Sequence, residues 1–131
     1  MITEDYVSFE TAKLLKEKGF NEPCYCFYKI ENEDNILIET CIDSSNSELE
    51  KENEFICYSA PTLQMAAKWL RETYNLFPVI EPFLTEETKP KYWVYVIWNN
   101  NIPKYMQSKL NYYTPEEALE STIKYCLENL I

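Results

Sequence analysis

Seven consecutive apolar or aromatic residues at positions 92–98, Tyr-Trp-Val-Tyr-Val-Ile-Trp, constrain the fold more than any other segment of the chain. Alternate side chains of a β-strand point to opposite faces of the sheet, so a strand here has two apolar faces. Such a strand belongs in the centre of a sheet that is covered on two sides, or it leaves one face for a partner. The candidate interaction residues of this region are Tyr92, Trp93, Tyr95, Trp98 and, downstream, Tyr105.

The chain contains a single glycine, Gly19, and its position indicates how the first helix ends. Apolar spacing predicts a helix over residues 9–18, and Ser8 is a suitable N-cap. Gly19 then takes the left-handed position after the last turn, and Phe20 folds back onto the helix. The glycine is therefore used for helix termination and is not available for a phosphate-binding loop.

Two more helices are predicted from apolar stripes and capping residues. One begins at residue 61 or 62, with Pro61 in its first turn, and ends at residue 74. The other begins at Thr114, where Thr114 as N-cap, Pro115 and Glu117 form a capping box, and it continues to the last residues of the chain.

The segments between the helices predict an antiparallel sheet. Strands are expected at residues 24–30, 36–42, 54–58, 79–84 and 92–98, with a sixth at 102–106 or 109–113. Pro82 should end the fourth strand early or place it at a sheet edge, residues 85–91 and 99–101 should form turns, and residues 43–53 should form a mobile loop. The predicted fold class is α+β, one antiparallel sheet of five to six strands with three helices, in the order α-β-β-β-α-β-β-(β)-α. The length of 131 residues predicts one domain, residues 1–131.

The net charge of −10 is concentrated in one part of the chain. Residues 31–54 contain nine acids and one lysine, which account for −8 of the total. These acids are Glu31, Glu33, Asp34, Glu39, Asp43, Glu48, Glu50, Glu52 and Glu54. They either keep polar loops soluble, or they bind a basic partner by imitating a phosphate backbone, for which Glu31, Glu33, Asp34, Glu48, Glu50, Glu52 and Glu54 are the candidates.

The chain lacks the residues that most enzymes and metal sites use. It has no histidine, which is the most frequent general acid, general base and metal ligand. Five cysteines are present, Cys24, Cys26, Cys41, Cys57 and Cys126, but their spacing is not that of a zinc knuckle, and packing in the core explains them as well. We therefore predict no catalytic residue, no cofactor and no metal.

The location of the protein is predicted from the cysteines and from the start of the chain. An odd number of cysteines and a polar, acidic beginning without a secretory pattern predict reduced thiols in the cytoplasm. No segment approaches the roughly 20 apolar residues that a membrane span needs.

Direct binding of nucleic acid is not expected. A helix, three strands and a helix over residues 9–74 is also the element order of double-stranded-RNA-binding domains, which contact phosphates with lysines near the start of the second helix. The corresponding segment here, residues 60–64, reads Ala-Pro-Thr-Leu-Gln, and the loops before it are acidic.

Three stretches of the sequence resemble a known group of proteins. They are residues 6–10 with 12–20, residues 60–66 with 68–72, and residues 113–118 with 123–131. They resemble small proteins from prophage or other mobile-element regions of Bacteroides-type gut bacteria. This resemblance implies a cytoplasmic accessory protein of a phage or mobile element, and it implies no catalytic residues.

The sequence thus predicts an accessory protein that acts through protein–protein contact, either with another protein or as a homodimer. The alternative is an acidic nucleic-acid mimic that occupies a DNA- or RNA-binding protein. An enzyme would require a deep pocket with converging acids or an activated thiol.

Overall fold

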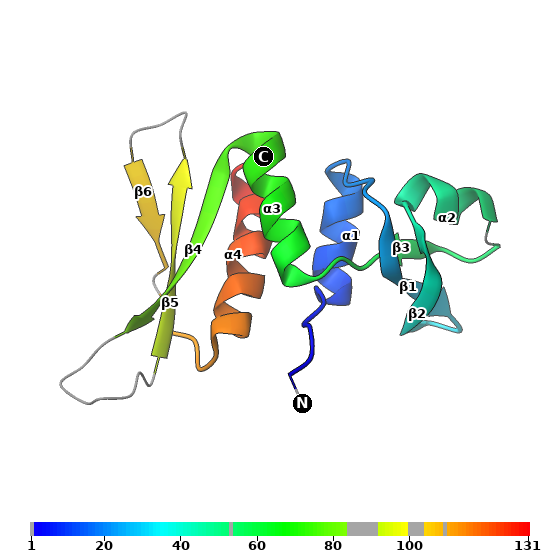
Figure 1. Ribbon diagram of the computed structural model, residues 1–131, viewed down its shortest axis with the longest axis horizontal. Helices are drawn as coiled ribbons and strands as arrows, with labels where there is room; N and C mark the ends of the chain where they lie inside the picture. The colour runs from blue at the N-terminus through cyan, green and yellow to red at the C-terminus, as the bar shows by residue number, and fades with distance from the viewer. Residues whose placement is uncertain (1, 53, 84–91, 100–103, 109) are drawn as a thin grey trace. The chain divides into compact units, whose positions relative to one another are not determined.

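The computed structural model describes residues 2–52, 54–83, 92–99, 104–108 and 110–131 (Figure 1). The elements in chain order are α1 (Phe9–Glu17), β1 (Cys24–Glu31), β2 (Asp34–Ser44), α2 (Asn46–Glu52), β3 (Cys57–Ser59), α3 (Leu63–Tyr74), β4 (Leu76–Phe83), β5 (Tyr92–Asn99), β6 (Lys104–Gln107) and α4 (Pro115–Asn129). The fold is α+β with antiparallel strand pairs, as predicted. The chain divides into two compact units, Met1–Gln64 and Met65–Ile131, and the single domain stays a prediction.

Two details of the predicted architecture are wrong. The described strands form two three-stranded sheets, β2-β1-β3 and β4-β5-β6, and not one sheet. Each strand pairs within its own compact unit, so the antiparallel pairs stay close in sequence. The described helices number four, because α2 lies within residues 43–53, where a mobile loop was expected.

The ends of α1 have the predicted geometry. The backbone N–H of Thr11 donates to Ser8 Oγ at 3.3 Å, which caps the first turn. Gly19 has a φ of +93°, its N–H donates to Lys16 O at 3.1 Å, and Phe20 N–H donates to Leu15 O at 2.9 Å. These two bonds form a Schellman motif, which confirms that Gly19 serves helix termination.

In the first unit, one face of the β2-β1-β3 sheet packs against α1. The Phe9 ring makes edge-on contacts with Tyr28 on β1 and Tyr58 on β3, with centroids 5.7 and 5.6 Å apart. The Tyr28 hydroxyl donates to Val7 O at 2.7 Å. The β1–β2 hairpin closes through Asn32 and Glu33, both with positive φ, as a tight two-residue hairpin turn requires.

The opposite face of this sheet carries α2, which is fixed by one buried amide. Asn46 Nδ2 donates to Phe20 O at 2.7 Å, and the N–H of Ser59 donates to Asn46 Oδ1 at 2.8 Å. Leu49 is buried one turn later. Ser45 caps the first turn of α2, because its Oγ accepts the N–H of Glu48 at 3.3 Å, and Asn46 joins this turn to the end of α1 and to β3.

In the second unit, α4 covers one face of the β4-β5-β6 sheet (Figure 1). Its N-cap is confirmed, because the N–H of Glu117 donates to Thr114 Oγ1 at 3.1 Å and Pro115 is the first helical residue. Its buried stripe consists of Ala118, Leu119, Thr122, Ile123, Cys126 and Leu127.

Several predicted boundaries shift. β3 begins three residues later than expected, and α3 begins at Leu63 because Pro61 O accepts the N–H of Val7 in an extended segment. β4 begins at Leu76 and continues through Pro82, which pairs with Trp93, so Pro82 does not end the strand, although the strand is at the sheet edge. The short β6 overlaps the first of the two expected positions. Residues 84–91, 100–103 and 109, on which other expected turns and strand ends fall, lie outside the described residues.

Candidate interaction surfaces

The aromatic strand β5 is the central strand of its sheet, as its sequence predicts. Val94, Tyr95, Val96 and Ile97 are all buried. Tyr95 lies on the face that α4 covers, because its ring contacts Tyr125 of α4 at a centroid distance of 6.3 Å. Tyr95 belongs to the core, and its burial raises the pKa of the phenol to about 12.

The other face of this sheet, called the outer sheet face below, carries exposed apolar side chains. Direct cross-strand pairs put Phe77, Val79, Glu81 and Phe83 of β4 beside Trp98, Val96, Val94 and Tyr92 of β5. Trp98 is 50% exposed, Phe83 46% and Val79 37%. No described helix of the second unit covers this face in Figure 1, and Trp98, Phe83 and Val79 are its exposed apolar side chains, whereas Val94 and Val96 are buried.

The predicted aromatic residues are therefore divided between two environments. Tyr92 and Trp98 lie on the outer sheet face, whereas Trp93 and Tyr95 lie on the face toward α4. The backbone of Tyr105 pairs with Trp98, and its side chain lies outside what the structure describes.

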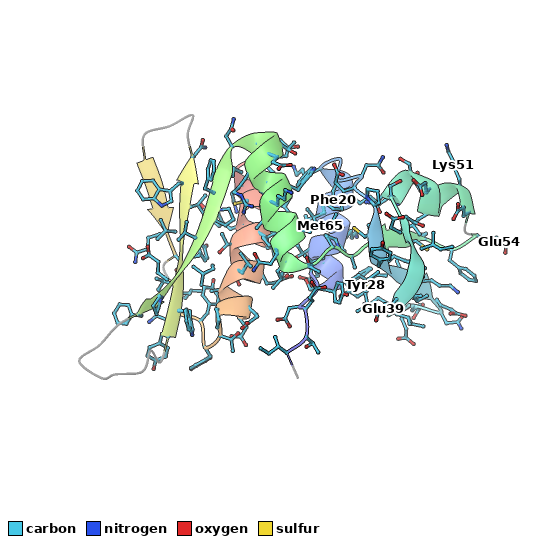
Figure 2. All side chains as sticks on the ribbon, viewed as in Figure 1. Phe20, Tyr28, Glu39, Lys51, Glu54 and Met65 are labelled. Atoms are coloured by element: carbon cyan, nitrogen blue, oxygen red, sulfur yellow. The ribbon has the colours of Figure 1, made fainter. Side chains whose placement is uncertain are left out.

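Nearly all of the net charge belongs to the first unit. Met1–Gln64 contains fourteen acids and five lysines, a net charge of −9, whereas Met65–Ile131 has a net charge of −1. The predicted acids are distributed over this unit. Glu31, Glu33 and Asp34 lie at the β1–β2 turn, and Glu48, Glu50 and Glu52 lie on α2. Glu54, which is labelled in Figure 2, follows α2.

Two of these acids are ion-paired within the chain. Glu31 Oε2 is 3.5 Å from Lys29 Nζ, and Glu50 Oε1 is 2.8 Å from Lys16 Nζ. The hydrogen bond from Lys16 lowers the pKa of the Glu50 carboxyl. The seven acids therefore form local groups at different elements, and two of them are partly neutralised.

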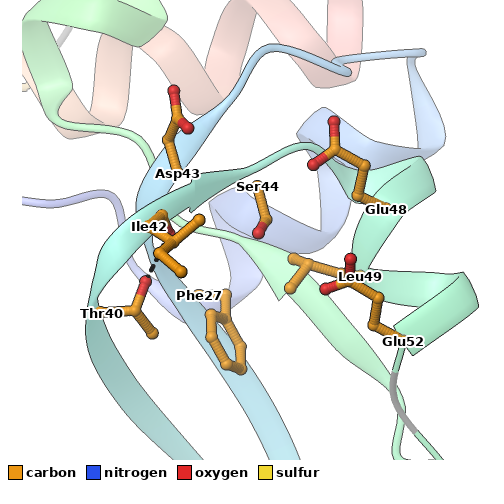
Figure 3. A pocket seen from close by; sticks show the side chains of 8 residues that line it. All are labelled: Phe27, Thr40, Ile42, Asp43, Ser44, Glu48, Leu49 and Glu52. Atoms are coloured by element: carbon orange, nitrogen blue, oxygen red, sulfur yellow. Dashed lines mark hydrogen bonds between the residues drawn. The ribbon is translucent and has the colours of Figure 1, made fainter.

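A groove of about 460 Å³ lies between β2 and α2 (Figure 3). It is lined by Phe27 of β1, by the end of β2 and by α2. The lining residues are Phe27, Thr40, Ile42, Asp43, Ser44, Glu48, Leu49 and Glu52. Among the candidate acids, this groove brings together Glu48 and Glu52, and it adds Asp43, which the sequence had placed only in the acidic segment.

The sequence did not predict this groove. Its floor and wall depend on α2 and on an irregularity in β2, and neither has an apolar periodicity that a sequence pattern would detect. The signal in the sequence was the spacing of Ser45 and Glu48, since the N–H of Glu48 donates to Ser45 Oγ at 3.3 Å and caps α2.

The described cysteines are free thiols in the core. Burial raises the pKa of Cys24 and of Cys126 to about 12, and burial also raises the pKa of Cys57. A thiol with a raised pKa is a weak nucleophile and a poor metal ligand near pH 7. Within the described residues, no group of three or more cysteine, aspartate or glutamate side chains is arranged to hold a metal ion.

Comparisons with protein-family models, with curated proteins and with solved structures find no match to this chain. In the part of the chain that the structure describes, no helix has both the length and the apolar character needed to cross a membrane.

Proposed function

We propose that this protein is an accessory protein that binds another protein through the outer sheet face. The observation that carries the proposal is the half-exposed Trp98 beside Phe77, on a sheet whose opposite face is already covered by α4. Tryptophan is enriched among the residues that dominate binding energy at protein interfaces.

The charge of this face favours a different protein over a second copy of this chain. Glu81 is exposed on the outer sheet face beside Val94, near the end of the edge strand β4. A symmetric dimer would place two Glu81 carboxylates in one interface, on two chains that each carry −10. A partner with an apolar patch and one basic residue opposite Glu81 avoids this repulsion.

The proposal is tested with a photo-crosslinking residue at Val79 and, as a control, at Tyr25, which is 57% exposed on the first unit. The protein crosslinked from Val79 is identified, and its affinity is measured for the wild type, Trp98→Ser and Tyr25→Ser. We expect Trp98→Ser to weaken binding by roughly thirtyfold, as for a central aromatic anchor, and Tyr25→Ser to leave it unchanged. Equal affinities of the two variants, or a crosslink to a second copy of this chain, would refute the proposal.

A second candidate function is the nucleic-acid mimic, which is favoured by the net charge of −9 on the first unit. A mimic would bind its partner with a steep dependence on salt and would be displaced by DNA. Binding through the outer sheet face would change little between about 50 and 500 mM salt, because the unit that carries this face has a net charge of only −1. The salt dependence of the same complex therefore separates the two functions.

A further inference from the structure

The groove between β2 and α2 exists because the pairing of β2 with β1 is irregular. Cys24 pairs with Ser44 and Cys26 pairs with Glu39, so the single residue Tyr25 lies opposite four residues of β2. A bulge of this kind bends the strand and redirects its side chains, and such bulges are frequent beside binding sites. Thr40 Oγ1 stabilises the bulge, donating to Ile42 O at 2.6 Å.

The bulge leaves an apolar side chain exposed beside the groove. Ile42 is 75% exposed and lines the groove together with Phe27 and the buried Leu49 (Figure 3). The three residues come from β2, β1 and α2, so the apolar lining is held by three elements. An exposed isoleucine at such a place is suited to contact with a partner side chain.

The same groove is lined by three carboxylates. Glu48 and Glu52 are four residues apart on α2, and therefore lie on one face of that helix, while Asp43 comes from the end of β2. All three are exposed, and the described lining contains no lysine or arginine. Glu50, in contrast, pairs with Lys16 of α1. The groove thus combines an apolar lining with an uncompensated negative charge.

We propose that this groove binds a basic segment of a partner protein. A lysine or arginine of the segment lays its aliphatic stem against Phe27 and Ile42, where Phe27 also offers a ring face to the cation. Its charged end then reaches the carboxylates of Glu48 and Glu52. This site lies in the first unit and does not rest on the outer sheet face.

The shape of the groove favours a protein segment over a free small cation. Small-molecule sites bury about 70–90% of the surface of their ligand. Here the acids and Ile42 are exposed, so a free polyamine would remain largely in water. A peptide continues beyond the groove in both directions and gains contacts that a small cation lacks.

The test measures the binding of a fluorescein-labelled peptide of about twelve residues that contains several arginines around one leucine, by fluorescence anisotropy. The groove variant is Glu48→Gln with Glu52→Gln. The matched control is Glu33→Gln with Asp34→Asn, which removes the same charge from the same unit at the β1–β2 turn. We expect at least a tenfold loss of affinity for the groove variant and less than a twofold loss for the control.

A third variant, Ile42→Ser, keeps every charge and should weaken the peptide about three- to tenfold if the apolar lining takes part. Equal losses from the two charge variants would show that the peptide senses only the overall charge of the unit, and this would overturn the proposal. Spermine binding as tightly as the peptide would also overturn it, in favour of a polyamine site. Far-UV circular dichroism verifies that each variant is folded.

Discussion

The substitution Asn46→Ala tests most directly whether the segment after β2 is an anchored helix. The Asn46 amide makes two buried hydrogen bonds, to Phe20 O at 2.7 Å and from Ser59 N–H at 2.8 Å. Alanine removes the amide that makes both bonds, so the carbonyl of Phe20 and the N–H of Ser59 lose these hydrogen bonds in the core. Each such group costs about 1–3 kcal/mol, so the free energy of unfolding should fall by roughly 2–6 kcal/mol. This is a large part of the 5–15 kcal/mol that is typical of a domain.

The matched control for this prediction is Asn21→Ala. Asn21 Oδ1 accepts hydrogen bonds from Ser47 N–H at 2.8 Å and from Ser47 Oγ at 3.0 Å, but both are exposed, and water replaces them. The control should therefore lower the free energy of unfolding by less than about 1 kcal/mol. The measurement is urea unfolding followed by far-UV circular dichroism with linear extrapolation. A loss of less than about 0.5 kcal/mol for Asn46→Ala would refute the reasoning, because a mobile loop at this position would tolerate the change.

Two further predictions concern backbone conformation and pH. Gly19→Ala should lower the free energy of unfolding by about 1 kcal/mol, because a φ of +93° is strained for a residue with a Cβ. The strain arises from the backbone alone, since no residue beyond the two chain neighbours comes within 4 Å of the added carbon, and an unchanged urea midpoint would contradict the prediction. The free energy of unfolding should fall as pH rises from about 9 toward 12. Burial raises the pKa of Cys24 and Cys126 from 9.0, and that of Tyr95 from 10.0, to about 12 in the folded state. The unfolded chain therefore loses these protons at a lower pH than the folded chain does. Urea midpoints measured at pH 8, 10 and 11 test the trend, which Tyr95→Phe should reduce and which a constant midpoint would exclude.

The features that follow from local chemistry could be predicted from the sequence. Gly19 and Thr114 end and begin helices through bonds to residues within five positions, so their spacing is sufficient evidence. The central position of β5 follows from its two apolar faces. These elements account for both ends of the fold and for the strand of the proposed interface.

The features that depend on contacts distant in sequence could not be predicted. α2 has one buried apolar residue, Leu49, and it is held by the buried Asn46, whose partners lie 26 and 13 residues away. The division into two sheets is likewise a choice of partners, which strand patterns do not encode. Whether Trp98 is exposed depends on which face of β5 the helix α4 covers. This is again a contact between residues that are distant in sequence.

Among the described strands, β4 has one unpaired edge, and the backbone chemistry of this edge bears on aggregation. Trp93 and Tyr95 direct their backbone hydrogen bonds to the side of β5 away from β4, toward Tyr112 and Ser108. Pro82 and Ile80 of β4 lie opposite Trp93 and Tyr95, and Pro78 precedes Ile80 by two residues. The backbone groups of these three residues therefore point away from β5, toward the outer edge of β4. Only Ile80 of these three has an N–H to donate. A strand from another molecule would find carbonyl oxygens at this edge but hardly any N–H donor. The prolines of β4 therefore disfavour the pairing of this edge with another molecule into a larger sheet.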